Sequence, residues 1–293
     1  MSHRATGRAS SFTGHPLAGV VRWVNERELH VKVRLLATDA PEPHGQEWVR
    51  ADRAPQRVPE LIELLRSAAC QGHQVSAAAV LAANLGRYVF GFAAATAYLT
   101  GRAPGLSAPR VWLRFSPSGG IDELALRPAA TAVLHSDPMA QFSGTVVVDD
   151  EAALDHWFIR SAVTTLTPIL AAVRDYTRFG TRPQWSMAAD SLYWALLLAS
   201  DEVGRDQWAA WDRATRMVGY INCGKHRVTP RQRAFPLTLA RRPPERPERL
   251  FLVRGGCCFY YKYAETMCAS CPLSSDEDRE RLLRGHFELS ARS

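Results

Sequence analysis

The sequence predicts an α+β fold: a helix-rich main domain with a few short strands and a hairpin, followed by a small C-terminal segment. Long segments carry the apolar spacing of helices, whereas alternating segments typical of strands are few and short. Four of the six cysteines fall within fifteen positions near the C-terminus. A chain of 293 residues is long enough to bury a substantial core, as one large domain or two modest ones.

The N-terminal half of the predicted main domain, which spans residues 17–226, begins with an alternating strand at 29–33. Residues 40–55 are polar and carry prolines, so we expect a loop. An amphipathic helix is predicted over 59–70, and its Cys70 is interpreted as an inert core thiol. A long, alanine-rich helix should follow over 75–100.

The C-terminal half of the main domain is predicted to begin with a hairpin and to continue mainly as helices. The turn Ser116-Pro117-Ser118-Gly119-Gly120 separates the two hairpin strands. Gly180 and Pro183 should break the helical pattern over 178–184. The expected elements are hairpin strands at 110–115 and 123–127, a strand at 145–148, and helices over 151–176, 185–204 and 205–219.

Composition indicates a soluble globular protein, with 46% hydrophobic and 22% charged residues. Residues 1–16 contain arginines but no apolar stretch, so we expect a disordered tail rather than a signal peptide. Asn84 and Arg87 interrupt the most apolar segment, 75–99, which favours a buried helix and no transmembrane segment. We therefore expect a cytoplasmic protein, either free or peripheral at the inner face of the membrane, where thiols stay reduced.

Residues 227–253 are rich in arginine and proline, which indicates an extended, solvated linker. A second interpretation is a basic surface, including Arg241 and Arg242, that attracts an acidic electron donor. The net charge of +7 is modest, and no nucleic-acid-binding motif is present, so no nucleic-acid partner is expected.

The C-terminal segment, 254–293, carries the cysteine pattern that organises the chain. Cys257 and Cys258 follow two glycines, and Cys268-x-x-Cys271 precedes a helix predicted over 274–283. Two adjacent cysteines can both ligate the same metal centre only in an irregular loop, which Gly255 and Gly256 would allow. Structural zinc usually takes two spaced pairs, whereas a Cys₄ set can also hold a [2Fe–2S] cluster. The pattern favours the iron–sulfur cluster; structural zinc, disulfides and free thiols remain alternatives.

These residues resemble the C-terminal signature of the FhuF-like ferric-siderophore reductases. The similarity extends upstream to residues 168–194, and the spacer of nine residues is one shorter than usual for the family. The resemblance implies a [2Fe–2S] reductase that transfers one electron to ferric iron in a siderophore, expected to be a hydroxamate, and releases Fe(II). The four cysteines would be the cluster ligands. The matching residues are Cys257, Cys258, Phe259, Tyr260, Tyr261, Cys268, Cys271 and Pro272.

Two further groups of residues have both a functional and an ordinary interpretation. The helix-breaking segment could place Arg178, Arg182 and Trp185 at the mouth of a substrate site, or they could simply cap helices and pack in the core. The residues after the cysteine pair could tune the cluster through hydrogen bonds and solvent exposure, or could only pack. These are Tyr260, Tyr261 and Lys262.

The sequence carries no G-x-G-x-x-G after a strand, so no nicotinamide or flavin site is expected. Electrons should then arrive from a separate donor, such as a ferredoxin or a flavoprotein. Cys223-Gly-Lys-His226 is half of a Rieske-like pattern without its second loop, and we interpret it as a surface loop. Two alternatives to the reductase remain: a siderophore-iron binding module with a structural Cys₄ zinc site, and a ferredoxin-like electron carrier.

Overall fold

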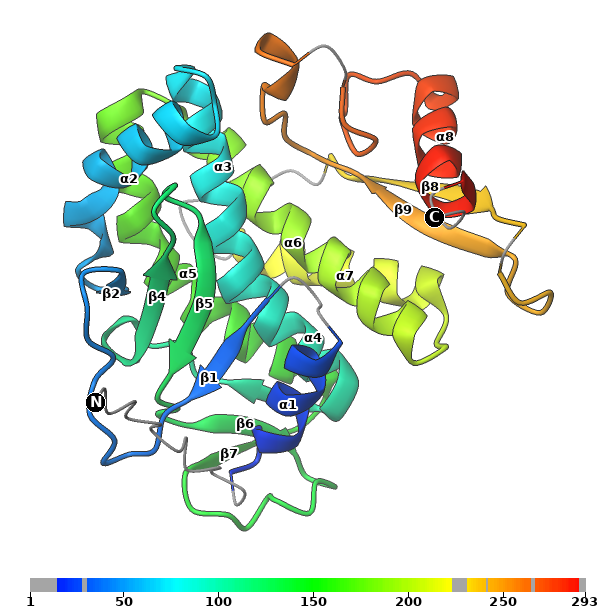
Figure 1. Ribbon diagram of the computed structural model, residues 1–293. Coiled ribbons are helices and arrows are strands. Elements are labelled where there is room, and N and C mark those ends of the chain that lie inside the picture. The colour runs from blue at the N-terminus through cyan, green and yellow to red at the C-terminus, as the bar shows by residue number, and fades with distance from the viewer. Residues whose placement is uncertain (1–14, 28–30, 223–230, 241, 265–266, 290–293) are drawn as a thin grey trace, which may run out of the picture.

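The computed structural model describes residues 15–27, 31–222, 231–240, 242–264 and 267–289, and it confirms the α+β class. Helices and small sheets form the main body, and the cysteine-bearing C-terminal segment lies beside α6 (Thr181–Glu202) and α7 (Gln207–Ile221) (Figure 1). The elements of the first half are α1 (Ala18–Glu26), β1 (Val33–Leu35), β2 (Trp48–Arg50), α2 (Ala54–Ala68), α3 (Gln74–Gly86), the π-helical turn η1 (Arg87–Gly91) and α4 (Phe92–Thr100).

The first half differs from the sequence prediction mainly at element boundaries. Residues 28–30 lie outside the described part, and β1 begins only at Val33. The expected loop over 40–55 contains β2, which pairs with β4 (Val111–Phe115), so this prediction was wrong in part. Helix α2 begins five residues before Pro59, with a proline already in its first turn, where the missing N–H has no helical partner to lose.

A row of buried side chains crosses the four-stranded sheet, whose order is β1-β5-β4-β2. Val33 lies opposite Leu124, Leu124 opposite Leu113, and Leu113 opposite Val49. All four are buried in the main hydrophobic core, which fixes the register, because a slip by one residue would turn this row toward the other face. The strands of this half are β3 (Arg102–Pro104), β4 (Val111–Phe115), β5 (Ile121–Leu126), β6 (Thr131–Leu134) and β7 (Thr145–Val148), with the short helix η2 (Ala108–Arg110) before β4.

Three long helices complete the main body: α5 (Glu151–Thr177), α6 (Thr181–Glu202) and α7 (Gln207–Ile221). The Asp150 side chain caps α5 by accepting from the Ala153 amide at 2.7 Å. The expected break over 178–184 is shorter than predicted, because α6 already begins at Thr181. Helix α6 packs closely on α3: a Cβ on Gly86 would lie 2.5 Å from the Cα of Ala188. This close crossing makes α6 the buried support of the site described below.

The predicted long helix over 75–100 is observed as the continuous run α3–η1–α4. It is long and apolar enough to cross a membrane by length and composition, but 78% of its most apolar window is buried inside the protein. Such burial is typical of the core helix of a soluble protein.

The segment expected as a linker, 227–253, instead contains a β-hairpin in its described part. Strands β8 (Arg233–Thr238) and β9 (Glu248–Val253) pair in antiparallel register, with Phe235 opposite Phe251. After the hairpin come the short turn η3 (Tyr260–Lys262), α8 (Asp276–Arg284) and the π-helical turn η4 (Gly285–Leu289). Helix α8 confirms the helix expected over 274–283. Its Leu283 joins Phe235, Leu237 and Val253 in a small separate core, and β9 rests on α6 and α7.

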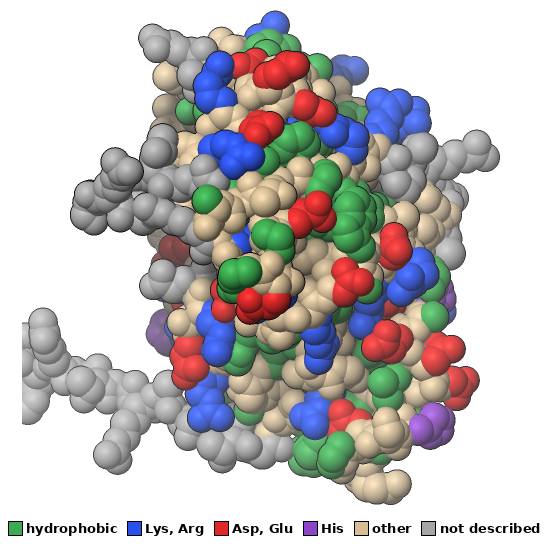
Figure 2. All heavy atoms as spheres, turned by 90° about the vertical axis from the view of Figure 1, so that its right-hand side faces the viewer, with side chains coloured by type: hydrophobic (Ala, Val, Ile, Leu, Met, Phe, Trp, Pro, Cys, Tyr) green, Lys and Arg blue, Asp and Glu red, His purple; other side chains and the backbone are tan. Residues whose placement is uncertain are grey.

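The arginines of this segment do not form a uniformly basic surface. Arg242 makes an ion pair with Asp201 at 2.6 Å, and Arg249 approaches the same carboxylate at 3.5 Å. Figure 2 shows Lys and Arg side chains intermingled with Asp and Glu on the face that carries this segment. Arg241 lies outside the described residues. Arg242 is therefore held against the main domain, and a basic surface that attracts an acidic donor stays a prediction.

Candidate metal centre

The four clustered cysteines lie in two loops of the C-terminal segment. Cys257 and Cys258 follow β9, and Cys268 and Cys271 precede α8. The thiols of Cys258 and Cys268 are hydrogen-bonded to each other, and those of Cys257 and Cys271 form a second hydrogen-bonded pair. The hairpin and α8 thus bring together residues that are ten and fourteen positions apart, and the two thiol pairs connect the two loops.

Backbone and side-chain donors point at all four sulfurs. The Arg254 guanidinium donates to the Cys258 Sγ at 3.2 Å and to the Cys268 Sγ at 2.8 Å. The Phe259 amide donates to the Cys257 Sγ at 3.3 Å, and the Leu273 amide donates to the Cys271 Sγ at 3.4 Å. Donors of this kind stabilise thiolates and tune the potential of clusters bound through sulfur.

The electrostatics of the Cys258–Cys268 pair favour one thiolate. The hydrogen bond from the Cys268 thiol, aided by the Arg254 guanidinium, lowers the pKa of Cys258 to about 5. The same hydrogen bond raises the pKa of Cys268. Burial raises the pKa of Cys257. The Cys258 sulfur is therefore prepared as an anion, the form in which cysteine binds metals.

Asp190 on α6 holds the loop that precedes the cysteine pair. Its carboxylate accepts from the Gly255 amide at 2.9 Å and from the Gln232 side chain at 2.7 Å, and it also accepts from the Gly256 amide. A Cβ on Gly255 would lie 2.8 Å from the Ser186 Oγ, and one on Gly256 would lie 2.8 Å from the Met187 Sδ. The described glycines with positive φ do not include these two, so their role is close approach to α6 rather than unusual torsion.

Arg279 on α8 organises the loop that carries the other two cysteines. Its side chain is 1% exposed and donates to the backbone carbonyls of Ala269, Cys271 and Ser274. Because a buried guanidinium needs several acceptors to offset its lost hydration, these bonds fix the loop tightly. Neither Asp190 nor Arg279 was among the sequence-predicted site residues. An arginine eight residues after Cys271 is a weak signal, and Asp190 gives none without the fold.

The loop after the cysteine pair docks on the turn between α2 and α3. Phe259 adopts a left-handed conformation, with φ of 58°, and its ring lies 6.2 Å from the rings of both His73 and Phe179. The Tyr263 hydroxyl is hydrogen-bonded to the Cys70 thiol. Cys70 is fully buried, as the core interpretation predicts, yet it lies beside the cysteine loop rather than far from it.

The predicted tuning residues Tyr260, Tyr261 and Lys262 form the turn η3. The Tyr260 amide donates to the Cys258 sulfur, whereas the side chains of Tyr260 and Lys262 are exposed. The Lys262 Nζ lies 5.1 Å from the centre of the Tyr261 ring. The backbone of this turn therefore reaches the site, and its role in tuning stays a prediction.

The predicted substrate residues Arg178, Arg182 and Trp185 lie in three different environments. Arg178 is the exposed, left-handed C-cap of α5, and Trp185 is buried against Phe90 with ring centres 6.3 Å apart. Arg182 lines a hollow of about 210 Å³ together with Cys257. The fold brings only Arg182 to the cysteines, so the ordinary interpretation describes Arg178 as a cap and Trp185 as core.

The four thiols lie as two hydrogen-bonded pairs rather than around one point. Within the part of the chain that the structure describes, no three His, Cys, Asp or Glu side chains converge as they would around one metal ion. A [2Fe–2S] cluster takes two thiolates at each iron, and its presence here stays a prediction. Cys223 and His226 lie outside the described residues.

Comparison with protein-family models finds no match for this chain, and comparison with curated proteins finds none either.

The buried carboxyl of Asp190 gives a testable dependence of stability on pH. Burial raises the pKa of Asp190 from 3.8 to about 7, although the Gly255 amide and the Gln232 side chain partly oppose this rise. The contribution of Asp190 to stability is therefore complete below pH 4 and is lost as the pH rises through 7, by an amount on the order of 4 kcal/mol. In Asp190→Asn the amide keeps the acceptor oxygen but does not ionise. We expect it to raise Tm relative to wild type more at pH 8.5 than at pH 5.5.

Asp155→Asn is the matched control for this measurement. Asp155 is also buried, but its two oxygens accept from the Arg213 guanidinium at 2.8 and 2.9 Å. Removing this charge leaves the buried Arg213 guanidinium with only the exposed Glu151 carboxylate, at 3.3 Å, so the variant should lower Tm at both pH values. Equal Tm changes for Asp190→Asn at the two pH values would contradict a raised pKa of Asp190.

Proposed function

We propose that this chain is a [2Fe–2S] reductase that passes one electron to ferric iron held by a siderophore, releasing Fe(II) in the cytoplasm. The observation that carries the proposal is the arrangement of the four cysteines in two pairs with hydrogen-bond donors on their sulfurs. Cys257, Cys258, Cys268 and Cys271 would hold the cluster. The bound cluster supplies a one-electron carrier next to the protein surface.

The chain's own residues hold and shield that carrier. Asp190 and Arg279 fix the two cysteine loops through backbone hydrogen bonds. Arg254 places a positive charge against two of the sulfurs, which favours the more negative, reduced state. Cys257 lines a hollow together with Arg182 and Arg231, and Cys268 is only half-buried, so the site is reachable from outside.

The reaction needs no acid, base or covalent step from the protein. One electron enters Fe(III), which becomes Fe(II), and a separate donor protein, such as a ferredoxin or flavoprotein, replaces that electron. Hard oxygen ligands hold Fe(II) much less tightly than Fe(III), so the ion is released and the freed oxygens take protons from water. The affinity difference between the two oxidation states sets how low the protein's potential must lie.

An anaerobic titration tests the proposal. The purified protein is reduced with dithionite, its visible and EPR spectra are recorded, and a ferric siderophore is added together with an Fe(II) trap. We expect a [2Fe–2S] signal that disappears as the trapped Fe(II) complex forms, with one Fe(II) for each electron stored.

Two other outcomes would each replace the proposal with a different function. A colourless protein containing zinc would make the chain a siderophore-iron binding module with a structural Cys₄ site. A cluster that forms but is not reoxidised by any ferric siderophore would make it an electron carrier for another acceptor.

A further inference from the structure

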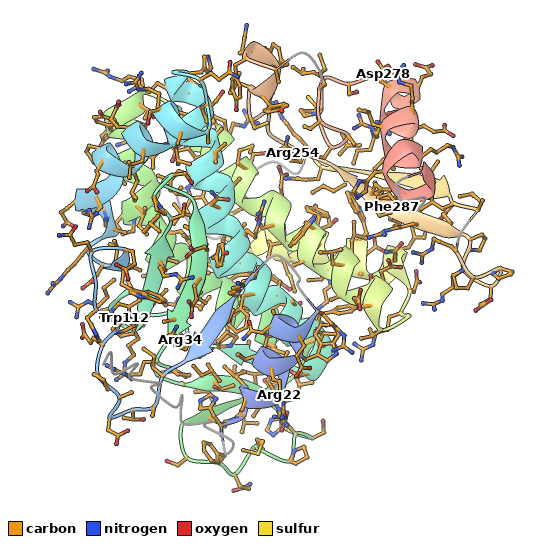
Figure 3. All side chains as sticks on the ribbon, viewed as in Figure 1. Arg22, Arg34, Trp112, Arg254, Asp278 and Phe287 are labelled. Atoms are coloured by element: carbon orange, nitrogen blue, oxygen red, sulfur yellow. The ribbon has the colours of Figure 1, made fainter. Side chains whose placement is uncertain are left out.

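A cavity of about 350 Å³ lies between the main domain and the cysteine-bearing segment. One wall comes from α3, η1 and α6, and the other from β9, the loop between Cys268 and Cys271, and α8. Its volume is at the lower end of the range for ligand pockets, enough for one arm of a larger ligand. Figure 3 shows Arg254 between α6 and the cysteine-bearing segment, at this junction.

Arg87 brings a positive charge to this cavity. It begins the π-helical turn η1, an irregularity that often occurs at functional sites. Its guanidinium lies 5.7 Å from the centre of the Trp194 ring, and among the described residues it makes neither an ion pair nor a hydrogen bond. Burial lowers the pKa of Arg87, which indicates that its charge lacks compensation. A bound anion would supply it.

Two further polar groups on the cavity wall have unused hydrogen-bonding capacity. Asp190 is 5% exposed, and its Oδ2 has no partner among the described residues, although Oδ1 is fully engaged in holding the glycine loop. The buried Nε of Arg254 also lacks a partner there. Trp194, Phe251 and Leu252 add aromatic and apolar surface. The cavity therefore combines unmet donors and acceptors with a hydrophobic lining, as small-molecule sites do.

We propose that this cavity binds one anionic, oxygen-donor arm of the ferric chelate, with Arg87 as the residue that selects for negative charge. This inference rests on the proposed function for the identity of the ligand, but not for the existence of the site. Arg254 lines the cavity and donates to two cysteine sulfurs, so an arm bound here lies one side chain away from the candidate metal centre.

Charge decides which chelates fit best. The ionisable lining groups are two arginines and one aspartate, and Asp190 has a pKa of about 7, so it can remain protonated beside an anion and donate to it. A carboxylate-bearing chelate of net negative charge supplies a counter-charge to the Arg87 guanidinium, whereas a neutral trihydroxamate complex has no net charge to supply. The cavity thus favours citrate-type mixed carboxylate–hydroxamate chelators over the simple hydroxamate that the family resemblance implies.

Calorimetry with gallium(III) complexes tests the site separately from electron transfer, because gallium(III) matches the size and charge of Fe(III) but is not reduced by the protein. The cluster-loaded protein is titrated with the gallium complex of a citrate-based dihydroxamate and with that of a neutral trihydroxamate. We expect the anionic complex to bind at least about tenfold more tightly. Arg87→Gln should weaken it by about 10- to 100-fold, the range for a lost hydrogen bond to a charged group.

Arg22→Gln is the control, because Arg22 is exposed on α1, far from Arg254 in the view of Figure 3, and its removal should leave binding unchanged. Ala83→Leu is a second variant that enlarges a side chain on the cavity wall without changing charge, and it should also weaken binding. Equal affinity of wild type and Arg87→Gln for the anionic complex, or no binding of it to the wild type, would overturn the cavity proposal. If the anionic complex binds in a way that depends on Arg87 but the protein never reduces ferric iron, the cavity proposal is upheld and the proposed reductase function is overturned.

Discussion

Cys258→Ser should abolish the [2Fe–2S] cluster or reduce it to a small residue of its wild-type iron and visible absorbance. Cys258 is the sulfur on which the local donors concentrate, since Arg254, the Cys268 thiol and the Tyr260 amide all donate to it. A serine oxygen binds iron less strongly at neutral pH because its hydroxyl is far less acidic than a thiol. Iron and sulfide content per chain, with the visible spectrum, measures the result.

Cys70→Ala is the matched control for the cysteine substitution. Cys70 is a buried thiol hydrogen-bonded to Tyr263, close to the same loop, but it belongs to neither thiol pair. Its loss should cost some stability and leave the iron content intact. A wild-type spectrum in Cys258→Ser would falsify the ligand role of Cys258. Loss of the cluster in both variants would show that the loop's packing, rather than its ligands, had been tested.

Arg254→Gln should lower the reduction potential of the bound cluster by at least about 59 mV, a tenfold change for a one-electron step. The guanidinium donates to two of the four sulfurs from a part-buried position. Its positive charge stabilises the reduced state more than the oxidised one, because reduction adds a negative charge at the sulfurs. A potentiometric titration followed by EPR gives the potential directly.

Two substitutions control this measurement. Arg254→Lys keeps the charge but not the two-pronged geometry, so its potential should lie between those of Arg254→Gln and wild type. Arg233→Gln removes a half-exposed arginine from the same segment, where it pairs with Asp276 rather than with a sulfur. Its potential should match wild type. A potential in Arg254→Gln that is unchanged or higher would contradict the stabilising role of Arg254.

Local signals predicted much of the fold, and their errors have physical causes. The hairpin of β4 and β5 and the long helix over 75–100 both depend on neighbours in sequence, and the structure confirms them. The hairpin of β8 and β9 was missed because its prolines and arginines resemble a linker. Leu237 and Val253 become a strand core only when Leu283 of α8 covers them.

The sequence by itself determined the candidate ligand set. Cysteines that bind a metal from the same loop must be close in the chain, so the spacing of Cys257, Cys258, Cys268 and Cys271 is visible without a fold. Only the tertiary structure decided what surrounds them. Asp190, Arg87 and Arg279 come from α6, η1 and α8, which lie far apart in sequence or bear no local mark of function. Their roles arise from packing. Helix α6 presses against the glycine loop, and a cavity remains beside it in which the Arg87 guanidinium has no hydrogen-bond or ion-pair partner among the described residues.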